Sequence, residues 1–130
     1  TDAFKKKIFD DINSYRAAHG KTPVTGLDGL DKAADAHAQM MSTKTAFGHD
    51  ELDIAQWLIN KNDVYSERLY DQILGGGGSG ETDNTITGNL EAAVYDESRM
   101  LDSWAHVGIG VYRTGDSSSL MYHADMIFTE

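Results

Sequence analysis

The first third of the chain carries two successive helical patterns of apolar residues, and this feature constrains the fold more than any other. In the first pattern, apolar side chains recur every three or four positions, which is the spacing of one helix face. Its members are Phe4, Ile8, Ile12 and Tyr15. Gly20 follows, and glycine often ends a helix because it adopts a left-handed backbone without strain. The pattern therefore predicts an amphipathic helix that ends near Gly20.

A second helix is predicted over residues 28–42. Asp28 and Asp31 stand at its start, where carboxylates accept hydrogen bonds from free amides and interact favourably with the helix dipole. The face expected to be buried consists of Leu30, Ala33, Ala34, Ala38 and Met41. Because alanine side chains are small, this face allows another element to approach closely.

The middle of the chain gives weaker signals. A short helix is predicted over residues 50–60 and a strand over residues 70–74. Glycine and serine impose no conformation, so residues 75–87 are expected to form a flexible Gly/Ser loop. Another helix is predicted over residues 88–101. The apolar edge of the 50–60 helix is Ile54, Trp57 and Leu58.

The last quarter of the chain alternates in the manner of β-strands. Residues 106–112 and 120–128 each predict a strand, with a turn-rich loop over residues 113–119 between them. Gly108 and Gly110 in the first of these strands allow close backbone contact. Helices followed by an antiparallel hairpin predict an α+β domain in which helices pack on a sheet.

Composition bounds the class of protein. With 130 residues and 40% hydrophobic content, residues 1–130 are expected to form a single domain with a substantial core. The sequence contains no run of eighteen apolar residues, so no membrane span is predicted. The 21 acidic and 11 basic residues give a formal charge of −10, which opposes nucleic-acid binding. The absence of cysteine excludes disulfides and thiolate metal sites.

Several motifs occur in an order that is similar to that of a known family. They are Asn13-x-x-Arg16 with His19-Gly20, Leu30 with Ala34 and Ala38, Phe47-Gly48-His49, Val107–Val111, and Tyr122–Phe128. The chain thereby resembles the CAP superfamily (SCP/PR-1-like or cysteine-rich secretory protein domains), and its cysteine-free bacterial branch in particular. The resemblance implies an α-β-α sandwich-like domain with helices on a small, mainly antiparallel sheet. It also implies a secreted or cell-surface location.

The resemblance further implies a cleft lined by histidine and acidic residues, which in some members of the family binds a divalent metal. His49 matches the first family histidine, and Asp71 matches a family glutamate, with Glu67 as a second candidate for that position. Glu97 lies where the family's second histidine is expected, and no histidine of this sequence occupies that position. The candidate cleft is therefore His49, Glu67, Asp71 and Glu97, with His49 and Asp71 as the candidate metal ligands.

A single histidine among carboxylates is a harder donor set than zinc prefers, and calcium or magnesium suits oxygen ligands better. Zinc and calcium are the ions considered, but a structural hydrogen bond from His49 is favoured over metal binding. His37, beside the apolar helix face, is interpreted as structural rather than as a ligand. Asn13 and Arg16 are expected to fix the first helix. Trp57 and Trp104 are predicted as core or semi-core anchors.

These observations favour a secreted or surface-associated binding module. Its cleft near His49 would take a small apolar ligand, a peptide or a partner protein, and no catalytic residue is assigned. The alternative is a metal-assisted hydrolase that uses His49 with Asp71 or Glu67 and Glu97.

Overall fold

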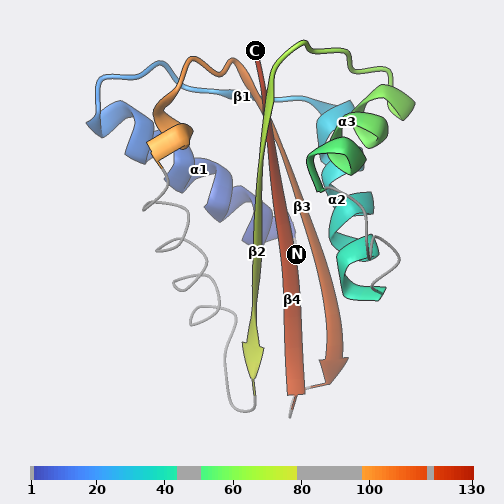
Figure 1. Cartoon of the computed structure of the whole chain (residues 1–130). Coiled ribbons are helices and arrows are strands. Elements are labelled where there is room, and N and C mark those ends of the chain that lie inside the picture. The colour runs from blue at the N-terminus through green and yellow to red at the C-terminus, as the bar shows by residue number, and fades with distance from the viewer. Residues whose placement is uncertain (1, 44–50, 79–97, 117–118) are drawn as a thin grey trace.

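Helices flank a central sheet in the computed structural model (Figure 1). The structure describes residues 2–43, 51–78, 98–116 and 119–130. In chain order the elements are α1 (Asp2–Ala18), β1 (Thr25–Gly26), α2 (Asp28–Thr43), α3 (Glu51–Lys61), β2 (Leu69–Gly78), the 3-10 helix η1 (Ser98–Leu101), β3 (His106–Asp116) and β4 (Ser119–Thr129). The three α-helices begin and end close to the predicted positions, and Gly20 adopts the expected left-handed backbone with φ 73°.

The sheet has the strand order β1-β3-β4-β2. β3 and β4 form the predicted antiparallel hairpin, and β2 pairs antiparallel with the other edge of β4. β1 runs parallel to β3 but pairs with it only at Thr25 and Gly26. Beyond these two residues β3 has no strand neighbour on its outer side among the described residues.

The sheet separates two hydrophobic layers, as the α-β-α prediction required. α1 lies on one side of the sheet, and α2 and α3 lie on the other (Figure 1). The core on the α1 side consists of Phe4, Ile8, Ile12, Val24, Tyr70, Met100, Trp104, Val107, Ile109, Val111, Ala124, Met126 and Phe128. The core on the α2 side consists of Leu30, Ala33, Ala34, Ile54, Ala55, Leu58, Ile59 and Ile127. Alternate residues of β4 enter opposite cores, because successive side chains of a strand point to opposite faces.

Two predicted loops are partly strand. Gly75 to Gly78 do not start a flexible loop, because they continue β2 and pair with His123 to Leu120 of β4. Residues 113–116 likewise extend β3 rather than a turn. In both places the backbone hydrogen bonds to a neighbouring strand override the weak local preference of the sequence. Residues 79–87 and residues 88–97 of the predicted helix lie outside the described residues, and residues 98–101 form η1.

The two tryptophans differ in their burial. Trp104 is buried as predicted and packs near the rings of Tyr70 and Phe128. The prediction for Trp57 is wrong, since 53% of it is exposed. The Nζ atom of Lys61 lies 4.2 Å from the centroid of the Trp57 ring. Trp57 therefore lies on the outer side of α3, where a lysine one turn away covers part of the ring.

α2 packs directly on the backbone of β3 because both elements are lined with small residues. A Cβ atom added at Gly108 would lie 2.2 Å from the carbonyl carbon of Leu30, and one at Gly110 would lie 2.1 Å from that of Ala34. Four residues of helix rise about 6 Å and two residues of strand about 6.8 Å, so contacts repeat in step along both elements. The sequence predicts a close approach at the alanine-rich helix and, separately, at the glycines of the strand; both are confirmed, and the structure shows that these two elements approach each other.

We predict that Gly110→Ala lowers the free energy of unfolding by about 2 kcal/mol or more, because the helix must move away to admit the methyl group. Gly26→Ala is the matched control, since a Cβ atom there meets nothing within 4 Å. Urea denaturation followed by circular dichroism measures both variants. Equal stability of the two would show that α2 does not lie this close to β3.

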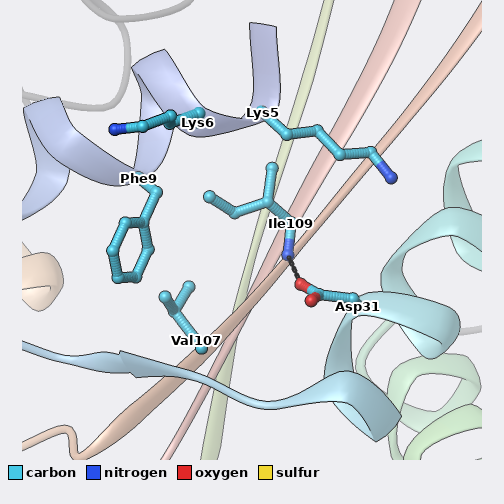
Figure 2. A pocket seen from close by; sticks show the side chains of 7 residues that line it. Lys5, Lys6, Phe9, Asp31, Val107 and Ile109 are labelled. Carbon is cyan, nitrogen blue, oxygen red and sulfur yellow. Dashed lines mark hydrogen bonds between the residues drawn. The ribbon is translucent and has the colours of Figure 1, made fainter. Parts of the chain in front are cut away.

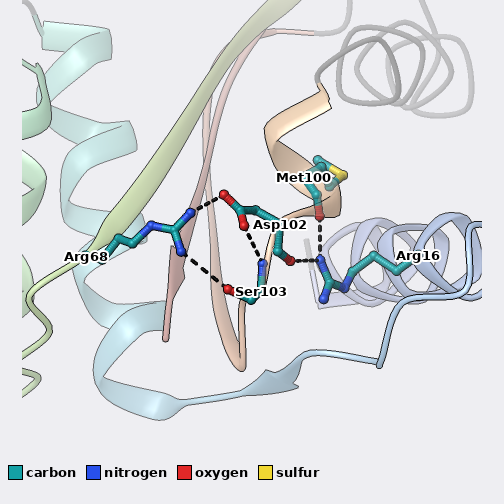
Figure 3. A network of polar contacts seen from close by, with 5 residues as sticks. All are labelled: Arg16, Arg68, Met100, Asp102 and Ser103. Carbon is teal, nitrogen blue, oxygen red and sulfur yellow. Dashed lines mark hydrogen bonds and ion pairs between the residues drawn. The ribbon is translucent and has the colours of Figure 1, made fainter.

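A buried arginine joins the end of α1 to the segment that precedes β3 (Figure 3). Arg16 is 1% exposed and donates hydrogen bonds to four backbone carbonyl oxygens: those of Thr22 at 2.9 Å, Met100 at 2.5 Å, Asp102 at 2.9 Å and Trp104 at 3.4 Å. Burial lowers the pKa of this guanidinium, while the charge of Asp102 raises it.

Asn13 acts in the same way one turn earlier. Its side-chain amide donates to the carbonyl oxygen of Val24, and its side-chain oxygen accepts from the amide of Val24 at 2.8 Å. Both contacts agree with the expectation that Asn13 and Arg16 fix the first helix. They tie α1 to the connector that leads into β1.

We predict that Arg16→Met destabilises the protein by about 3 kcal/mol, because several buried carbonyl groups lose their donor. Arg68→Met is the comparison within the same network, since Arg68 pairs with the half-exposed Asp102 side chain (Figure 3). An exposed pair of this kind contributes less than about 1 kcal/mol. Thermal unfolding of the two variants tests the difference, and a larger loss in Arg68→Met would contradict this division of roles.

Candidate functional site

The residues expected from the sequence to line one cleft do not come together among the described residues. His49 and Glu97 lie outside those residues. Glu67 is exposed and lines a shallow hollow beside α3 with Gln56 and Asn60. Asp71 is on β2, with its side chain only 3% exposed. Of the four expected cleft residues, only Glu67 and Asp71 belong to the described part of the chain, and the grouping of His49 and Glu97 with them stays a prediction.

Asp71 belongs to a buried polar cluster with His37 and Asp125. The Nδ1 atom of His37 lies 3.1 Å from Oδ2 of Asp71 and 3.0 Å from Oδ2 of Asp125. His37 extends from α2, and the two aspartates lie on adjacent strands of the sheet that α2 covers. Asp71 pairs in register with Ile127, two residues from Asp125, so the two carboxylates are diagonal neighbours on one sheet face.

The cluster is closed to solvent. The side chains of His37 and Asp125 are 0% exposed. Burial by itself lowers the pKa of His37, but the hydrogen bonds and charges of Asp125 and Asp71 outweigh it and raise that pKa to about 11. Burial also raises the pKa of Asp125 well above its usual value, and Asp71 adds to this effect while His37 opposes it. The negative charge of the neighbouring aspartates thus outweighs the cost of burying the protonated imidazole of His37.

Three carboxylate oxygens in this cluster have no hydrogen-bond donor within the described part of the chain. They are both carboxylate oxygens of Asp71 and Oδ1 of Asp125. Buried polar atoms in folded proteins are nearly always paired, so these oxygens indicate that another donor or a cation belongs in the cluster. Within the described ranges, this is the only group of three histidine or acidic residues whose ligand atoms lie within 4.8 Å of one another.

Sequence reasoning identified one member of this cluster and missed the other two. The sequence favours a structural role for His37 beside the apolar face of its helix, and the residue is buried there. Asp125 was not singled out at all. Its only signal in the sequence is its place among Ala124, Met126 and Ile127, where a carboxylate inside an apolar strand requires a buried partner.

A second feature of the surface is a hollow between α1 and the outer edge of β3 (Figure 2). Its volume is about 330 Å³. Phe9 of α1 and Val107 and Ile109 of β3 supply its apolar wall, as Figure 2 shows. Its remaining lining residues are Lys5, Lys6, Gly26 and Asp31.

Two aspartates of α2 close the free edge of β3 beside this hollow. Oδ1 of Asp31 accepts the amide of Ile109 at 2.9 Å (Figure 2), and Oδ1 of Asp35 accepts the amide of Val111 at 3.1 Å. One turn of helix matches two residues of strand. The carboxylates therefore accept the hydrogen bonds that a neighbouring strand would otherwise accept, at a part of β3 where the described residues supply no such strand. Burial raises the pKa of Asp31, while the bond from Ile109 and the charge of Lys5 lower it.

We predict that Asp31→Asn and Asp31→Ala differ in stability. Asparagine retains an oxygen that accepts the Ile109 amide and carries no charge to desolvate, so its free energy of unfolding should remain close to that of the wild type. Alanine leaves the amide without this acceptor and should cost about 1 kcal/mol. Guanidinium denaturation measures both variants, and an alanine variant as stable as the asparagine variant would refute the role of the hydrogen bond.

Comparison with known proteins identifies the relatives of this chain. The model of the CAP family, described as the cysteine-rich secretory protein family, matches residues 9–128. Among curated proteins, none matches the sequence significantly.

Two solved bacterial structures share the fold. One is an extracellular protein containing an SCP domain from Bacillus anthracis str. Ames, with TM-score 0.70 and 17% identity over 99% of this chain and 41% of that one. The other is a cysteine-rich secretory protein from Staphylococcus aureus subsp. aureus Mu50, with TM-score 0.69 and 18% identity over 100% of this chain and 39% of that one. The chain thus spans about two fifths of each of these proteins. None of its described helices is both long enough and apolar enough to cross a bilayer.

Proposed function

This chain belongs to the cysteine-rich secretory protein (CAP) family, and we propose that it is an extracellular binding module for small amphipathic molecules. In this proposal the ligand places an apolar body in the hollow between α1 and β3 and an anionic end beside Lys5 and Lys6. The extracellular location is supported by the description of the structural relative from Bacillus anthracis as an extracellular protein.

The observation that carries the proposal is the combination of an apolar wall with lysines in an acidic protein. The chain has a formal charge of −10, yet three of its 11 basic residues are consecutive at the start of α1. Two of these, Lys5 and Lys6, line the hollow beside the side chain of Phe9. A largely apolar pocket with a few polar groups that fix orientation is the usual form of a small-molecule site.

The size and the ion pairs of the hollow favour a small ligand. Its volume of about 330 Å³ is near the lower end of the range of about 300–1,000 Å³ found for ligand pockets. Lys6 is 74% exposed and pairs with Asp10 at 2.6 Å. Exposed pairs of this kind contribute little stability, so Lys6 is able to exchange Asp10 for a ligand carboxylate at low cost.

Nothing among the described residues favours the alternative of a metal-assisted hydrolase. Asp71 is covered by α2 and has no open face for a substrate, whereas Glu67 lies apart from it at the surface. The hollow beside α1 contains neither residue. We therefore base the proposed function on binding.

The proposal is tested by calorimetric titration with decanoate, an apolar chain with one carboxylate. We predict saturable binding by the wild type and an affinity at least about tenfold lower for Gly26→Leu, because the added side chain fills the hollow. A Cβ atom at Gly26 meets no neighbour, so the substitution should leave the fold intact. Lys6→Glu should weaken binding about threefold or more, because it removes an exposed ion pair with the ligand carboxylate and places a like charge beside it.

Lys32→Glu is the matched control for the charge change. Lys32 is exposed and pairs with Asp28 four residues away, as Lys6 does with Asp10, but it does not line the hollow. Its variant should bind decanoate like the wild type. Absence of saturable binding by the wild type, or full affinity in Gly26→Leu, would reject the hollow as the ligand site.

A further inference from the structure

We propose that the end of α3 and the turn after it bind a neutral glycan chain, with the rings of Tyr65 and Trp57 stacking on its sugars. The site is the hollow beside α3, which has a volume of about 300 Å³. Its lining residues are Gln56, Asn60, Tyr65, Ser66 and Glu67. None of them lines the hollow between α1 and β3, so this site is separate from the one in the proposed function.

Aromatic rings are exposed at this corner of the molecule. Among the described residues the exposed large apolar side chains are Leu27, Trp57 and Tyr65. Tyr65 is 74% exposed and lines the α3 hollow. Trp57 lies three positions before Asn60 in α3, and residues with this spacing are neighbours on a helix surface. The hollow therefore has one exposed ring in its wall and a second ring beside it.

The ring of Trp57 is partly covered, but by a group that a ligand is able to displace. The Nζ atom of Lys61 lies 4.2 Å from the centroid of this ring. Both residues are exposed, and such a contact between a cation and a ring is weak in water. Tyr65 is therefore expected to be the main stacking surface, with Trp57 as the second.

The backbone at the end of α3 fixes the position of Tyr65. The amide of Val64 donates to the carbonyl oxygen of Ile59 at 2.9 Å, and Asp63 adopts a left-handed backbone with φ 62°. The amide of Asp63 donates to the carbonyl oxygen of Asn60 at 3.1 Å. These two bonds form the Schellman ending of a helix. Val64 packs on the core of the α2 side while the next residue, Tyr65, is exposed. Because this backbone is already ordered, a ligand that stacks on the ring pays little for ordering it.

Two side-chain amides on α3 supply polar groups next to the ring. Nε2 of Gln56 donates to Oδ1 of Asn60 at 3.1 Å, so the two amides orient each other. The other oxygen and nitrogen of this pair, Oε1 of Gln56 and Nδ2 of Asn60, make no hydrogen bond within the described part of the chain. One of them accepts and the other donates. Neighbouring hydroxyl groups of a sugar both donate and accept, so they complement this arrangement.

The chemistry of the lining selects a neutral sugar over other ligands. Glu67 is the only charged residue that lines the hollow, and the chain has a formal charge of −10, so an anionic ligand is disfavoured. A purely apolar ligand would cover the amides without pairing them, which is costly. A sugar ring with equatorial substituents has C–H groups on its faces for the aromatic rings and hydroxyl groups at its edge for the amides.

The test titrates the full chain with three probes and follows its backbone amide resonances by two-dimensional NMR. The probes are cellotetraose, N-acetylchitotetraose and tetralysine. We expect saturable shifts, centred on residues 56–67, with at least one of the two tetrasaccharides and none with tetralysine. The two sugars distinguish a chain of glucose from a chain of N-acetylglucosamine.

Variants test the roles of the ring and the amides. Tyr65→Ala should weaken binding at least about fivefold because the stacking surface is lost, whereas Tyr65→Phe keeps the ring and should remain within about twofold of the wild type. Asn60→Ala removes a donor and should weaken binding about threefold or more. Gln39→Ala is the matched amide control, since Gln39 is exposed on α2 and does not line the hollow. It should bind like the wild type, and circular dichroism checks that each variant is folded.

Shifts at residues 56–67 with a tetrasaccharide, together with weaker binding by Tyr65→Ala, support the proposal. It is overturned if neither sugar binds saturably, if the shifts centre elsewhere, or if folded Tyr65→Ala keeps full affinity. A response to tetralysine alone would also overturn it, because the surface would then recognise cations instead of sugars.

Discussion

The direct contact between α2 and the backbone of β3 is the constraint on which the other features depend. Gly108 and Gly110 have no side chains, and Leu30 and Ala34 occupy the space that a Cβ atom would require. This closeness allows Asp31 and Asp35 to reach the amides at the free edge of β3. It also places the next turn of the helix against the middle of the sheet. A wider separation would remove both sets of contacts together.

The two faces of the sheet have different properties because different helices cover them. α2 lies close to its face and buries His37 with Asp71 and Asp125, so this side offers a closed polar site. α1 lies on the opposite face, where its lysines and Phe9 border an open hollow beside β3. The proposed ligand site and the buried polar cluster therefore lie on opposite faces of one sheet.

Local patterns in the sequence predicted much of the fold. Helical periodicity placed all three α-helices, and strand alternation placed the terminal hairpin, because both patterns reflect which side chains face a core. The predictions failed where the decisive contacts are long-range. Gly75 to Gly78 have little intrinsic strand preference but pair with β4, and Trp57 fits the apolar edge of its helix but faces outward beside Lys61.

The sequence by itself determined the class of fold, the family, and the small residues that bring α2 close to β3. It also singled out Asp71, although with partners that the described structure does not place beside it. Only the tertiary structure decided that Asp71 lies diagonally opposite Asp125 and that His37, 88 positions before Asp125, lies between them. The reason is physical: strand register and helix position bring these residues together, and neither is encoded in the spacing of the residues along the chain.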